Sequence, residues 1–549
     1  MPSLAPFTGT LSRSQAAHLL HRAALGYSPA DLDAITGLTA SDAVDQLYDA
    51  TAPLPAPPVH PTTGTTFANR EELSDGTNAG FNRLYVRNWF LKQMVETTVP
   101  AREKMVLFWH THFTNDAEKT IYGFPLIAQN QLFRQYAYGS YKTLCTKVCR
   151  DYAMSVFLDG WRNYVTEPNE NFAREFLELY SIGKGEQVGP GDYTTFTEDD
   201  VREAARVLTG YIPTGFLPDG SGPAGAPPIE TDPDTGLYRT GIWALLHDAG
   251  TKSFSARFQN TTMNSGSNTV GEIEDELDAF IDMVFAQDAT AAFIVRKLYR
   301  FFCYYEITPA IETDIIQPLA ADLRTANYEV LPVLKRLLRS QHFYDADDTV
   351  VENDNIGAIV KSPIELVAGA VRYFGIDVGD ASDWQTHHDA LTVLTETSSA
   401  LGMVLFDTPE VAGYPAYHQA PFYNRNWISA DTLVNRYSAF NFLLFGIPVN
   451  GGALTMQLDS VDFVENAGAI TDPSDPNEVV DVLTEDLFPF GVDATKRDAL
   501  KEILLDGMAD SFWTSAWADY ASGGPDGVVR SRLNALFQAI LQSPEYQLS

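Results

Sequence analysis

Helix start signals recur along the chain, and they constrain its fold more than any other feature of the sequence. In such a signal, a hydroxyl side chain satisfies a free backbone N–H, and a carboxylate three residues later reaches back to the cap residue. Each signal precedes a run of apolar residues at helical spacing, which is typical of helices with one buried face. Four of these pairs are Ser28 and Asp31, Thr39 and Asp42, Thr197 and Asp200, and Ser362 and Glu365. The sequence therefore predicts a mainly α fold.

Further segments show the same apolar periodicity, and the stretches between them are rich in proline, glycine and threonine. The periodic segments are residues 70–96, 101–113, 272–286, 289–306, 326–340, 432–445 and 529–543. Residues 51–66 form a Pro/Thr-rich connector, and residues 212–271 hold brief strand-like pieces between turn residues. We expect a multi-helix, bundle-like body with long loops and a small β-like insertion at residues 212–271.

The length of the chain suggests several regions. At a typical size of about 150 residues per domain, a chain of this length contains two to four units. We expect an N-terminal helical region (1–211) with the His and Glu/Arg motifs, the Gly/Pro-rich insertion (212–271), a central helical region (272–450) and a C-terminal helical region (451–549). These regions are expected to fuse into one body.

Charge and hydropathy exclude several classes of partner. Lys and Arg total 37 against 72 Asp and Glu, a formal net charge of −35. Such a surface repels phosphate backbones, so we expect no nucleic-acid partner. The sequence has no apolar run near 18 residues, so no membrane span is expected, and the chain should be soluble. It also shows no secretory signal, so a cytoplasmic location is the default expectation, with export as the alternative if a leader was removed.

Several familiar catalytic motifs are missing. The sequence contains no Walker loop, no G-x-G-x-x-G after a strand, no G-x-S-x-G and no H-E-x-x-H. Their absence argues against the commonest nucleotide, dinucleotide, serine-hydrolase and zinc-protease sites. Three cysteines are also too few for a disulfide framework.

One predicted helix, within residues 167–188, carries a well-defined polar stripe. At 100° per residue, the stripe spans about 100° and lies opposite an apolar side. The stripe consists of Asn171, Arg174, Glu175 and Glu178, and the apolar side of Phe172, Phe176, Leu179 and Tyr180. Carboxylates three residues apart repel each other unless an arginine, a metal ion or a shared proton compensates. The stripe therefore fits three interpretations: a solvated face, a buried Glu/Arg network that includes Arg202 and Arg206, or a site.

Two histidines lie in a second helical segment, residues 101–116, which is apolar nearly all round. His110 and His112 are about 200° apart on a helix, so one helix cannot direct both side chains at one point. If the segment stops being helical near Trp109, the two imidazoles can share a side. The alternative for each histidine is a core position with both ring nitrogens satisfied.

Together, these segments resemble a known bacterial family, the one catalogued as domain of unknown function 1800. The resemblance extends from about residue 10 to about residue 545. Within the family, the sequence looks most similar to a Bacteroidetes-like branch. The blocks that carry it are FWHTHF, PNENFAREFLELYSIGKG, YTTFTEDDVREAARVLTGY, HDAGTKSF, IVKSPIELVAGAVRYFG and AGYPAYHQAPFYNRNWISADTLVNR. The resemblance implies a mostly helical, single-body architecture without an assigned reaction. It also implies a partner protein from a sulfatase-like secreted family encoded nearby.

The resemblance further implies a set of recurrent polar residues without assigned roles. They correspond here to His110, His112, Glu170, Asn171, Arg174, Glu175, Glu178, Glu198, Asp199, Arg206, His247, Asp248 and Lys361.

Our first hypothesis is a hydrolase-like enzyme that acts on an extracellular or cell-surface polymer. In this hypothesis a divalent metal ion activates water, Arg174 steadies an anionic group, and Glu170 or Asn171 orients it. The expected metal ligands are His110, His112, Glu175 and Glu178. Without metal, Glu175 and Glu178 would act as acid and base on a glycosidic bond.

Our second hypothesis is a non-catalytic binding or assembly protein. Here the Glu/Arg/His cluster is a structural ion-pair network that fixes the helices in register. A third alternative is contact with a polysaccharide through the aromatic segment that contains Tyr414, Tyr417, Tyr423 and Trp427.

Overall fold

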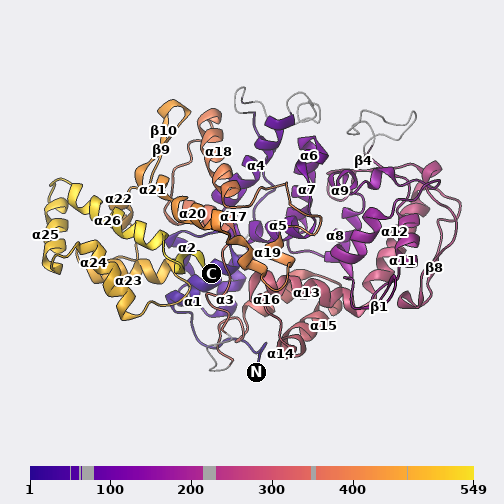
Figure 1. The fold of residues 1–549 in the computed structure, drawn as a ribbon, viewed down its shortest axis with the longest axis horizontal. Helices are drawn as coiled ribbons and strands as arrows, with labels where there is room; N and C mark the ends of the chain where they lie inside the picture. Colours follow the sequence, from indigo (N-terminus) through magenta and orange to yellow (C-terminus); the bar gives the residue numbers. More distant parts are fainter. Residues whose placement is uncertain (50, 61–63, 65–78, 214–229, 348–353, 467) are drawn as a thin grey trace.

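The protein is built mainly from helices (Figure 1). The computed structural model describes residues 1–49, 51–60, 64, 79–213, 230–347, 354–466 and 468–549. Within these residues, strands occur only as five short two-stranded antiparallel sheets. The predicted mainly α fold is therefore confirmed. Residues 70–78 of the first periodic segment and part of the 51–66 connector lie outside the described residues.

The N-terminal half begins with a series of helices that ends at the polar stripe. These are α1 (Arg13–Ala23), α2 (Pro29–Ile35), α3 (Ala40–Asp49), α4 (Ala79–Glu96), α5 (Pro100–His112), α6 (Ala117–Thr120), α7 (Gly123–Gln135), α8 (Tyr141–Val148) and α9 (Tyr152–Phe157). They are followed by η3 (Gly160–Arg162), α10 (Glu170–Glu175), η4 (Phe176–Ser181) and α11 (Glu198–Val207).

The central helices follow the β-like insertion, and the C-terminal helices form one end of the molecule (Figure 1). The central group is α12 (Val270–Phe285), α13 (Asp288–Phe302), α14 (Pro309–Ile311), η7 (Glu312–Ile316), α15 (Gln317–Thr325), α16 (Val330–Leu338), α17 (Pro363–Tyr373), α18 (Trp384–Ala400), α19 (Pro415–His418), η9 (Tyr423–Trp427), α20 (Ala430–Ser438) and α21 (Asn441–Phe445). The C-terminal group is α22 (Ser460–Asn466), α23 (Pro476–Leu487), α24 (Ala494–Leu505), α25 (Asp510–Ala521), α26 (Gly527–Leu541) and η11 (Glu545–Gln547).

Capping hydrogen bonds form at the four helix starts that the sequence predicts. Ser28, Thr197 and Ser362 cap α2, α11 and α17, each in a reciprocal capping box with the residue three positions on. At the start of α3, the Thr39 hydroxyl accepts from the Asp42 N–H at 3.1 Å. These contacts satisfy backbone N–H groups that the first turn of a helix leaves free.

Small sheets form in and beside the expected insertion. Inside it, β3 (Tyr211–Ile212) pairs with β6 (Gly241–Ile242), β4 (Glu230–Thr231) with β5 (Tyr238–Arg239), and β7 (Lys252–Ser253) with β8 (Thr262–Met263). Residues 214–229 lie outside the described residues. Two further pairs were not predicted: β1 (Gln187–Gly189) with β2 (Asp192–Tyr193), and β9 (Ile447–Val449) with β10 (Leu454–Met456).

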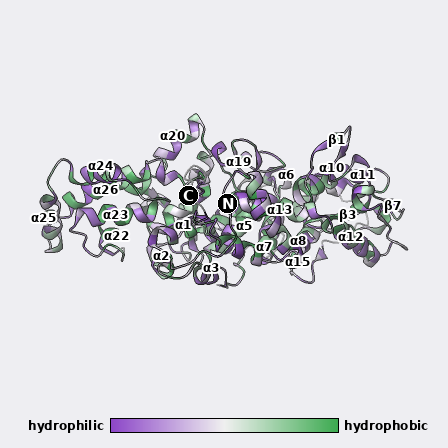
Figure 2. Cartoon of the chain, turned by 90° about the horizontal axis from the view of Figure 1, so that it is seen from below, coloured by the Kyte–Doolittle hydropathy of each residue, from purple (hydrophilic) through white to green (hydrophobic). Residues whose placement is uncertain are grey.

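The body is elongated, and both chain ends lie near the middle of its length (Figure 2). One hydrophobic cluster extends from Leu11 to Tyr546. Helix α1 lies against α23, where Arg13 Nη2 donates to Asp486 Oδ2 at 2.8 Å. At the C-terminus, the Ser549 N–H donates to the Ile359 carbonyl at 2.8 Å. Among the described helices, none is both long and apolar enough to cross a membrane.

Candidate functional site

The helix with the polar stripe ends in a π-helical turn, and its last carbonyls bind side chains from three other helices. Carbonyls at a helix C-terminus have no partner within the helix. The Leu179 carbonyl accepts from Lys297 Nζ at 3.0 Å. The Tyr180 carbonyl lies 3.3 Å from His112 Nε2 and also accepts from the Tyr141 hydroxyl. The stripe's helix therefore contributes to a site through its backbone.

Lys297 and His112 contact each other directly. Lys297 Nζ donates to His112 Nδ1 at 3.0 Å, so the imidazole is the tautomer that carries its proton on Nε2 and donates it to the Tyr180 carbonyl. Burial, reinforced by Lys297, holds the pKa of His112 well below its ordinary value. Burial also lowers the pKa of Lys297 to about 7, and the nearby Arg300 adds to the effect. An amine that titrates near neutrality thus lies against a neutral imidazole.

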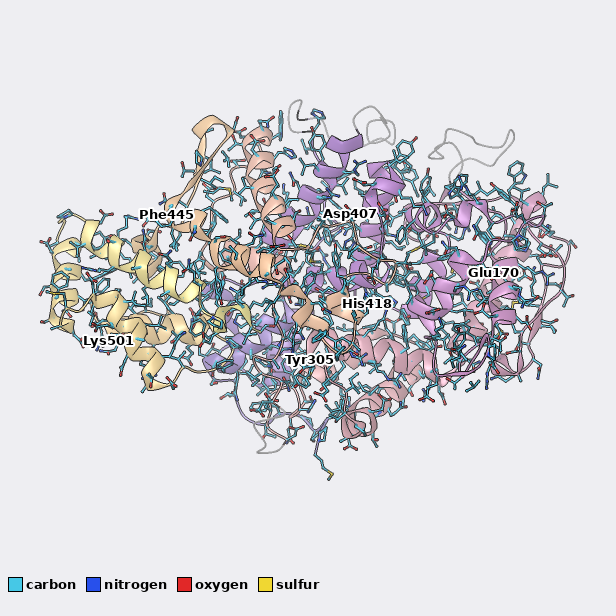
Figure 3. All side chains as sticks on the ribbon, in the orientation of Figure 1. Glu170, Tyr305, Asp407, His418, Phe445 and Lys501 are labelled. Carbon is cyan, nitrogen blue, oxygen red and sulfur yellow. The ribbon has the colours of Figure 1, made fainter. Side chains whose placement is uncertain are left out.

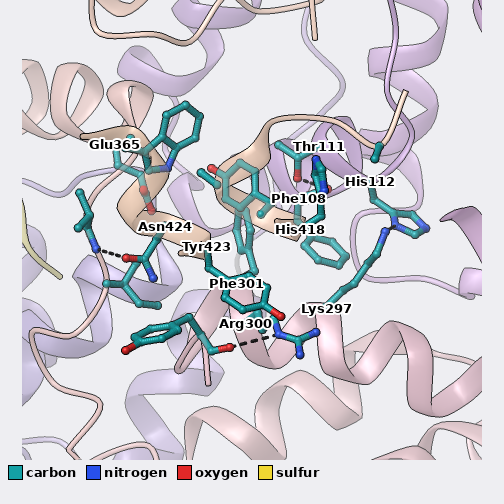
Figure 4. Close-up of a pocket in the computed structure, with 17 residues that line it drawn as sticks. Phe108, Thr111, His112, Lys297, Arg300, Phe301, Glu365, His418, Tyr423 and Asn424 are labelled. Carbon is teal, nitrogen blue, oxygen red and sulfur yellow. Dashed lines mark hydrogen bonds between the residues drawn. The ribbon is translucent and has the colours of Figure 1, made fainter. Parts of the chain in front are cut away.

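These two side chains open onto a small pocket between α5, α13, α19 and η9, which we call the basic pocket (Figure 4). Its volume is about 40 Å³, enough for a few non-hydrogen atoms. Its walls are the basic side chains His112, Lys297, Arg300 and His418, the aromatic side chains Phe108, Phe301, Tyr305, Tyr417, Tyr423 and Trp427, and Thr111, Ile359, Val360, Glu365, Ala412, Ala416 and Asn424.

Arg300 reaches the basic pocket without a carboxylate partner in the described part of the chain. Its Nε donates to the Tyr305 carbonyl at 3.2 Å, and its guanidinium lies 4.9 Å from the centre of the Tyr423 ring. The nearby carboxylate of Glu312 is already bound to Arg296, with Nη2 and Oε1 2.6 Å apart. Burial lowers the pKa of Arg300. Its remaining N–H groups are available to an anion.

Glu365 is the one acidic side chain in the pocket wall, and its charge is compensated by Lys104, with which it forms an ion pair. Burial alone would raise the pKa of Glu365, but Lys104 and the hydrogen bonds of Ser362 outweigh it and lower that pKa. The pocket therefore keeps an excess of basic groups.

His418 adds a buried ring nitrogen to the same wall. Its Nε2 makes no hydrogen bond to the described residues and lies 3.5 Å from Glu410 Oε2. Burial lowers the pKa of His418 and the charge of Lys297 adds to this effect, whereas the charge of Glu410 acts against it. A buried ring nitrogen without a hydrogen bond is costly unless something occupies the space beside it.

His110 occupies the other side of α5, as the predicted angle of about 200° indicates. Its Nε2 accepts from the Phe406 N–H at 3.2 Å, and its ring packs edge-on against Phe90 and Phe406. Burial lowers the pKa of His110 to about 4. His110 is therefore a core histidine, with one ring nitrogen paired and its Nδ1 without a hydrogen bond to the described residues.

Two charged side chains of the stripe, Arg174 and Glu178, form ion pairs with residues outside it. Arg174 donates to Glu198 Oε1 at 2.7 Å and to Glu170 Oε2 at 3.0 Å. Glu178 pairs with Lys184 at 3.0 Å, and Asn171 Nδ2 donates to the Leu158 carbonyl at 3.0 Å. Glu175 is half-buried, and burial together with the charge of Glu178 raises its pKa.

The expected metal site is not assembled, which corrects one of our predictions. The described residues contain no group of three or more His, Cys, Asp or Glu side chains that could hold a metal ion, so His110, His112, Glu175 and Glu178 do not form one. The physical reason is that the two histidines diverge from α5, and His112 meets the stripe's helix at its terminal carbonyls. Glu170 lies towards one end of the molecule, whereas His418 and Tyr305 lie near its centre (Figure 3).

The other residues implied by the resemblance lie in ion pairs and buried networks. Arg206 Nε donates to Asp248 Oδ2 at 2.7 Å, and Asp199 pairs with Arg202 on the surface. Lys361 Nζ donates to the Tyr546 carbonyl at 3.0 Å. His247 Nε2 lies 2.9 Å from Glu276 Oε2, a carboxylate that also accepts from Lys252 at 2.8 Å.

Reasoning from the sequence missed Lys297, Arg300, Glu365 and His418. One signal could have found the first two. The α13 segment DATAAFIVRKLYRFF carries three cationic side chains and has its one acidic residue at its first position, in a chain with 72 acidic residues. Two of those cations, three residues apart, share one face.

Comparison with known proteins matches nearly the whole chain to one family model. A family model described as "Protein of unknown function (DUF1800)" matches residues 18–548, which confirms the resemblance seen in the sequence. The Bacteroidetes-like branch stays a prediction. No curated protein and no solved structure matches the chain.

Proposed function

Since the chain belongs to the family described as protein of unknown function (DUF1800), we propose a function from the geometry of its own pocket. The protein is a hydrolase-like enzyme that binds a small anionic group in the basic pocket and uses Lys297 for acid–base chemistry. This proposal moves the expected catalytic centre from the carboxylates of α10 and η4 to the side chains of α13 and α5.

The single observation that carries the proposal is a pair of cations without carboxylate partners in a strongly acidic protein. Most lysine and arginine side chains in the described residues form ion pairs, as Arg174, Arg206 and Arg296 do. Lys297 and Arg300 instead contact carbonyls, an imidazole and aromatic rings. Buried or half-buried positive charge is normally compensated by an anion, which here would be the ligand.

The contacts of Lys297 suit general acid–base catalysis. With a pKa of about 7, its amine is present in both protonation states near neutral pH. In the fraction of complexes whose amine is neutral, the amine takes a proton from an attacking water molecule while the water oxygen bonds to the acyl, phosphoryl or sulfuryl centre. The leaving group then departs with a proton returned by the ammonium group. Arg300 would stabilise the negative charge that develops on the substrate oxygens.

The binding step can be tested by calorimetric titration with acetate, phosphate and sulfate. We expect Lys297→Met and Arg300→Met each to weaken binding of at least one of these anions tenfold or more. Arg336→Met is the control, because Arg336 is paired with Asp322 and is not part of the pocket wall. Binding that is unchanged in both pocket variants would overturn the proposal.

A second candidate function is a non-catalytic binding or assembly protein, and the pairing around Arg174 favours it. That guanidinium joins Glu170 of α10 to Glu198 of α11, as a structural network would. The two candidates differ in turnover. Release of nitrophenol from nitrophenyl acetate, phosphate or sulfate that is lost in Lys297→Met supports the enzyme. Anion binding without turnover of these or related esters supports the binding protein.

A further inference from the structure

A third cation without a carboxylate partner lies at the edge of the basic pocket. Arg425 of η9 is exposed, and its guanidinium lies 4.6 Å from the centre of the Tyr305 ring. One of its N–H groups donates to the Tyr305 hydroxyl. Among the described residues it forms no ion pair, although acidic side chains outnumber basic ones about twofold in this chain.

Arg300 and Arg425 are connected through two tyrosines. Arg300 lies over the ring of Tyr423, and Arg425 lies over the ring of Tyr305. The two rings are 6.2 Å apart, and both line the basic pocket. The two tyrosine rings therefore lie between Arg300 in the pocket wall and the exposed Arg425. Stacking on a ring fixes the plane of a guanidinium and leaves its N–H edge free for the oxygens of a carboxylate, phosphate or sulfate.

From this arrangement we infer that the protein has a second anion subsite at Arg425, and that its ligand is a small molecule with two anionic groups joined by a short spacer. One group enters the basic pocket at Lys297 and Arg300, and the other binds Arg425 at the rim. This inference rests on the proposed function, because it requires the inner group to bind first.

The size of the pocket and the charge of the protein support a small dianion. A volume of about 40 Å³ accommodates one anionic head group and leaves the rest of the molecule outside. The spacer then passes Tyr423 and Tyr305 on its way to Arg425. A long polyanion is disfavoured, because the net charge of −35 repels every group that extends beyond these three cations.

The inference predicts a gain in affinity for a dianion of the correct length. We would titrate the full-length protein with succinate, glutarate, adipate and 3-phosphonopropionate, and with acetate and butyrate as monoanions. At least one dianion should bind tenfold or more tightly than the monoanions. Arg425→Met should remove this advantage and leave monoanion affinity unchanged.

A matched control is available in Arg162→Met. Arg162 is also exposed and stacked on a ring, 4.3 Å from the centre of Trp161, without an ion pair in the described residues. It is not part of the pocket wall, so its substitution should not alter the affinity for either class of anion.

Different results would contradict the proposed function and the second anion subsite. If no monoanion binds and Lys297→Met changes nothing, the proposed function itself is wrong. If monoanions bind but no dianion gains affinity, or if Arg425→Met keeps the gain, only the second subsite is wrong. Equal effects of Arg425→Met and Arg162→Met would also contradict it, because the advantage would not come from the rim of the pocket.

Discussion

The ammonium group of Lys297 is surrounded by groups that cannot neutralise it. Its two hydrogen-bond acceptors, the Leu179 carbonyl and His112 Nδ1, carry no charge. His418 and Arg300 face the same amine, and Arg300 adds positive charge. An anion that enters the pocket would supply the missing negative charge and favour the protonated amine. Binding and protonation should therefore be coupled at this residue.

The coupling predicts how anion affinity depends on pH. Burial lowers the pKa of Lys297 to about 7, so the free protein loses the proton as the pH rises above that value. If the anion binds the ammonium form, the dissociation constant should be constant below the pKa and rise by up to about tenfold per pH unit above it. Burial also lowers the pKa values of His112 and His418, which moves the titration of these imidazoles to lower pH.

Calorimetric titration with sulfate between pH 5.5 and 9 measures this dependence. Lys297→Arg keeps the positive charge at every pH, so its affinity should hardly change. A pH dependence that is identical in the wild type and in Lys297→Arg would assign the titration to another group.

Glu175 offers a second prediction at this scale, because burial and Glu178 raise its pKa. A carboxyl group with a raised folded-state pKa binds more protons when folded than when unfolded. Its effect on stability therefore becomes unfavourable as the pH rises from its unfolded to its folded pKa. Glu175→Gln should leave the melting temperature at pH 7 unchanged or higher.

Glu170→Gln is the comparison for Glu175→Gln. Glu170 forms a partly exposed ion pair with Arg174, and such pairs contribute roughly 0–1 kcal/mol. Its substitution should lower the melting temperature slightly at pH 7. If Glu175→Gln is the more destabilising of the two, the Glu175 carboxylate has a structural partner that its raised pKa does not indicate.

Some of these residue positions follow from the sequence, and others do not. The divergence of His110 and His112 follows from helical geometry, and the structure confirms it. The meeting of Lys297 with His112 does not, because 185 positions separate them. Such a contact depends on how α5 and α13 pack, which local periodicity cannot supply.

At the scale of elements, the polar-stripe helix shows which features the local sequence pattern predicts and which it does not. Its start, its polar side and its buried side agree with the pattern of the sequence. The change to π-helical geometry at Phe176–Ser181 was not predicted, since a wheel at 100° per residue assumes uniform α-helix. This turn brings the last carbonyls beside Lys297 and His112, so the helix takes part in the site through its C-terminus.

The buried cluster of Glu276, Lys252 and His247 provides a prediction about how elements are joined. Both side chains of the Lys252–Glu276 pair are 0% exposed, and the cluster links α12 with β7 and with His247, which follows the short helix η5 (Ala244–Leu246). Glu276→Gln should lower the free energy of unfolding by about 3–5 kcal/mol, because it leaves a buried lysine without its counter-ion. Urea denaturation followed by circular dichroism measures the loss.

Asp199→Asn is the matched control for Glu276→Gln. Asp199 pairs with Arg202, but these side chains are 75% and 60% exposed. An exposed ion pair of this kind contributes roughly 0–1 kcal/mol, so the denaturation midpoint should hardly move. Similar losses in both variants would mean that burial does not determine the strength of these pairs.

At the scale of the whole molecule, the arrangement of the four expected regions depends on contacts between distant segments. The contact of α1 with α23 and the pairing of Ser549 with Ile359 join segments that are far apart in the sequence. The mainly α class could be predicted from capping and periodicity, whereas these contacts could not. The division into regions itself stays a prediction.

The net charge gives the last prediction, an increase in stability with salt. A formal charge of −35 makes the folded protein repel itself more than the expanded chain does, since folding brings the charges closer together. Raising the ionic strength from about 0.01 M to about 0.15 M shortens the Debye length from roughly 30 Å to roughly 8 Å. The repulsion between distant surface carboxylates is then largely screened, whereas the fully buried Lys252–Glu276 pair is screened much less.

The melting temperature should therefore rise over this range, as differential scanning fluorimetry can show. Potassium chloride and choline chloride should act alike if screening is the cause, because the bulky choline cation is a poor ligand for carboxylates. A rise with potassium alone would instead indicate specific cation binding. A fall with both salts would mean that the surface ion pairs stabilise the fold by more than the net charge destabilises it.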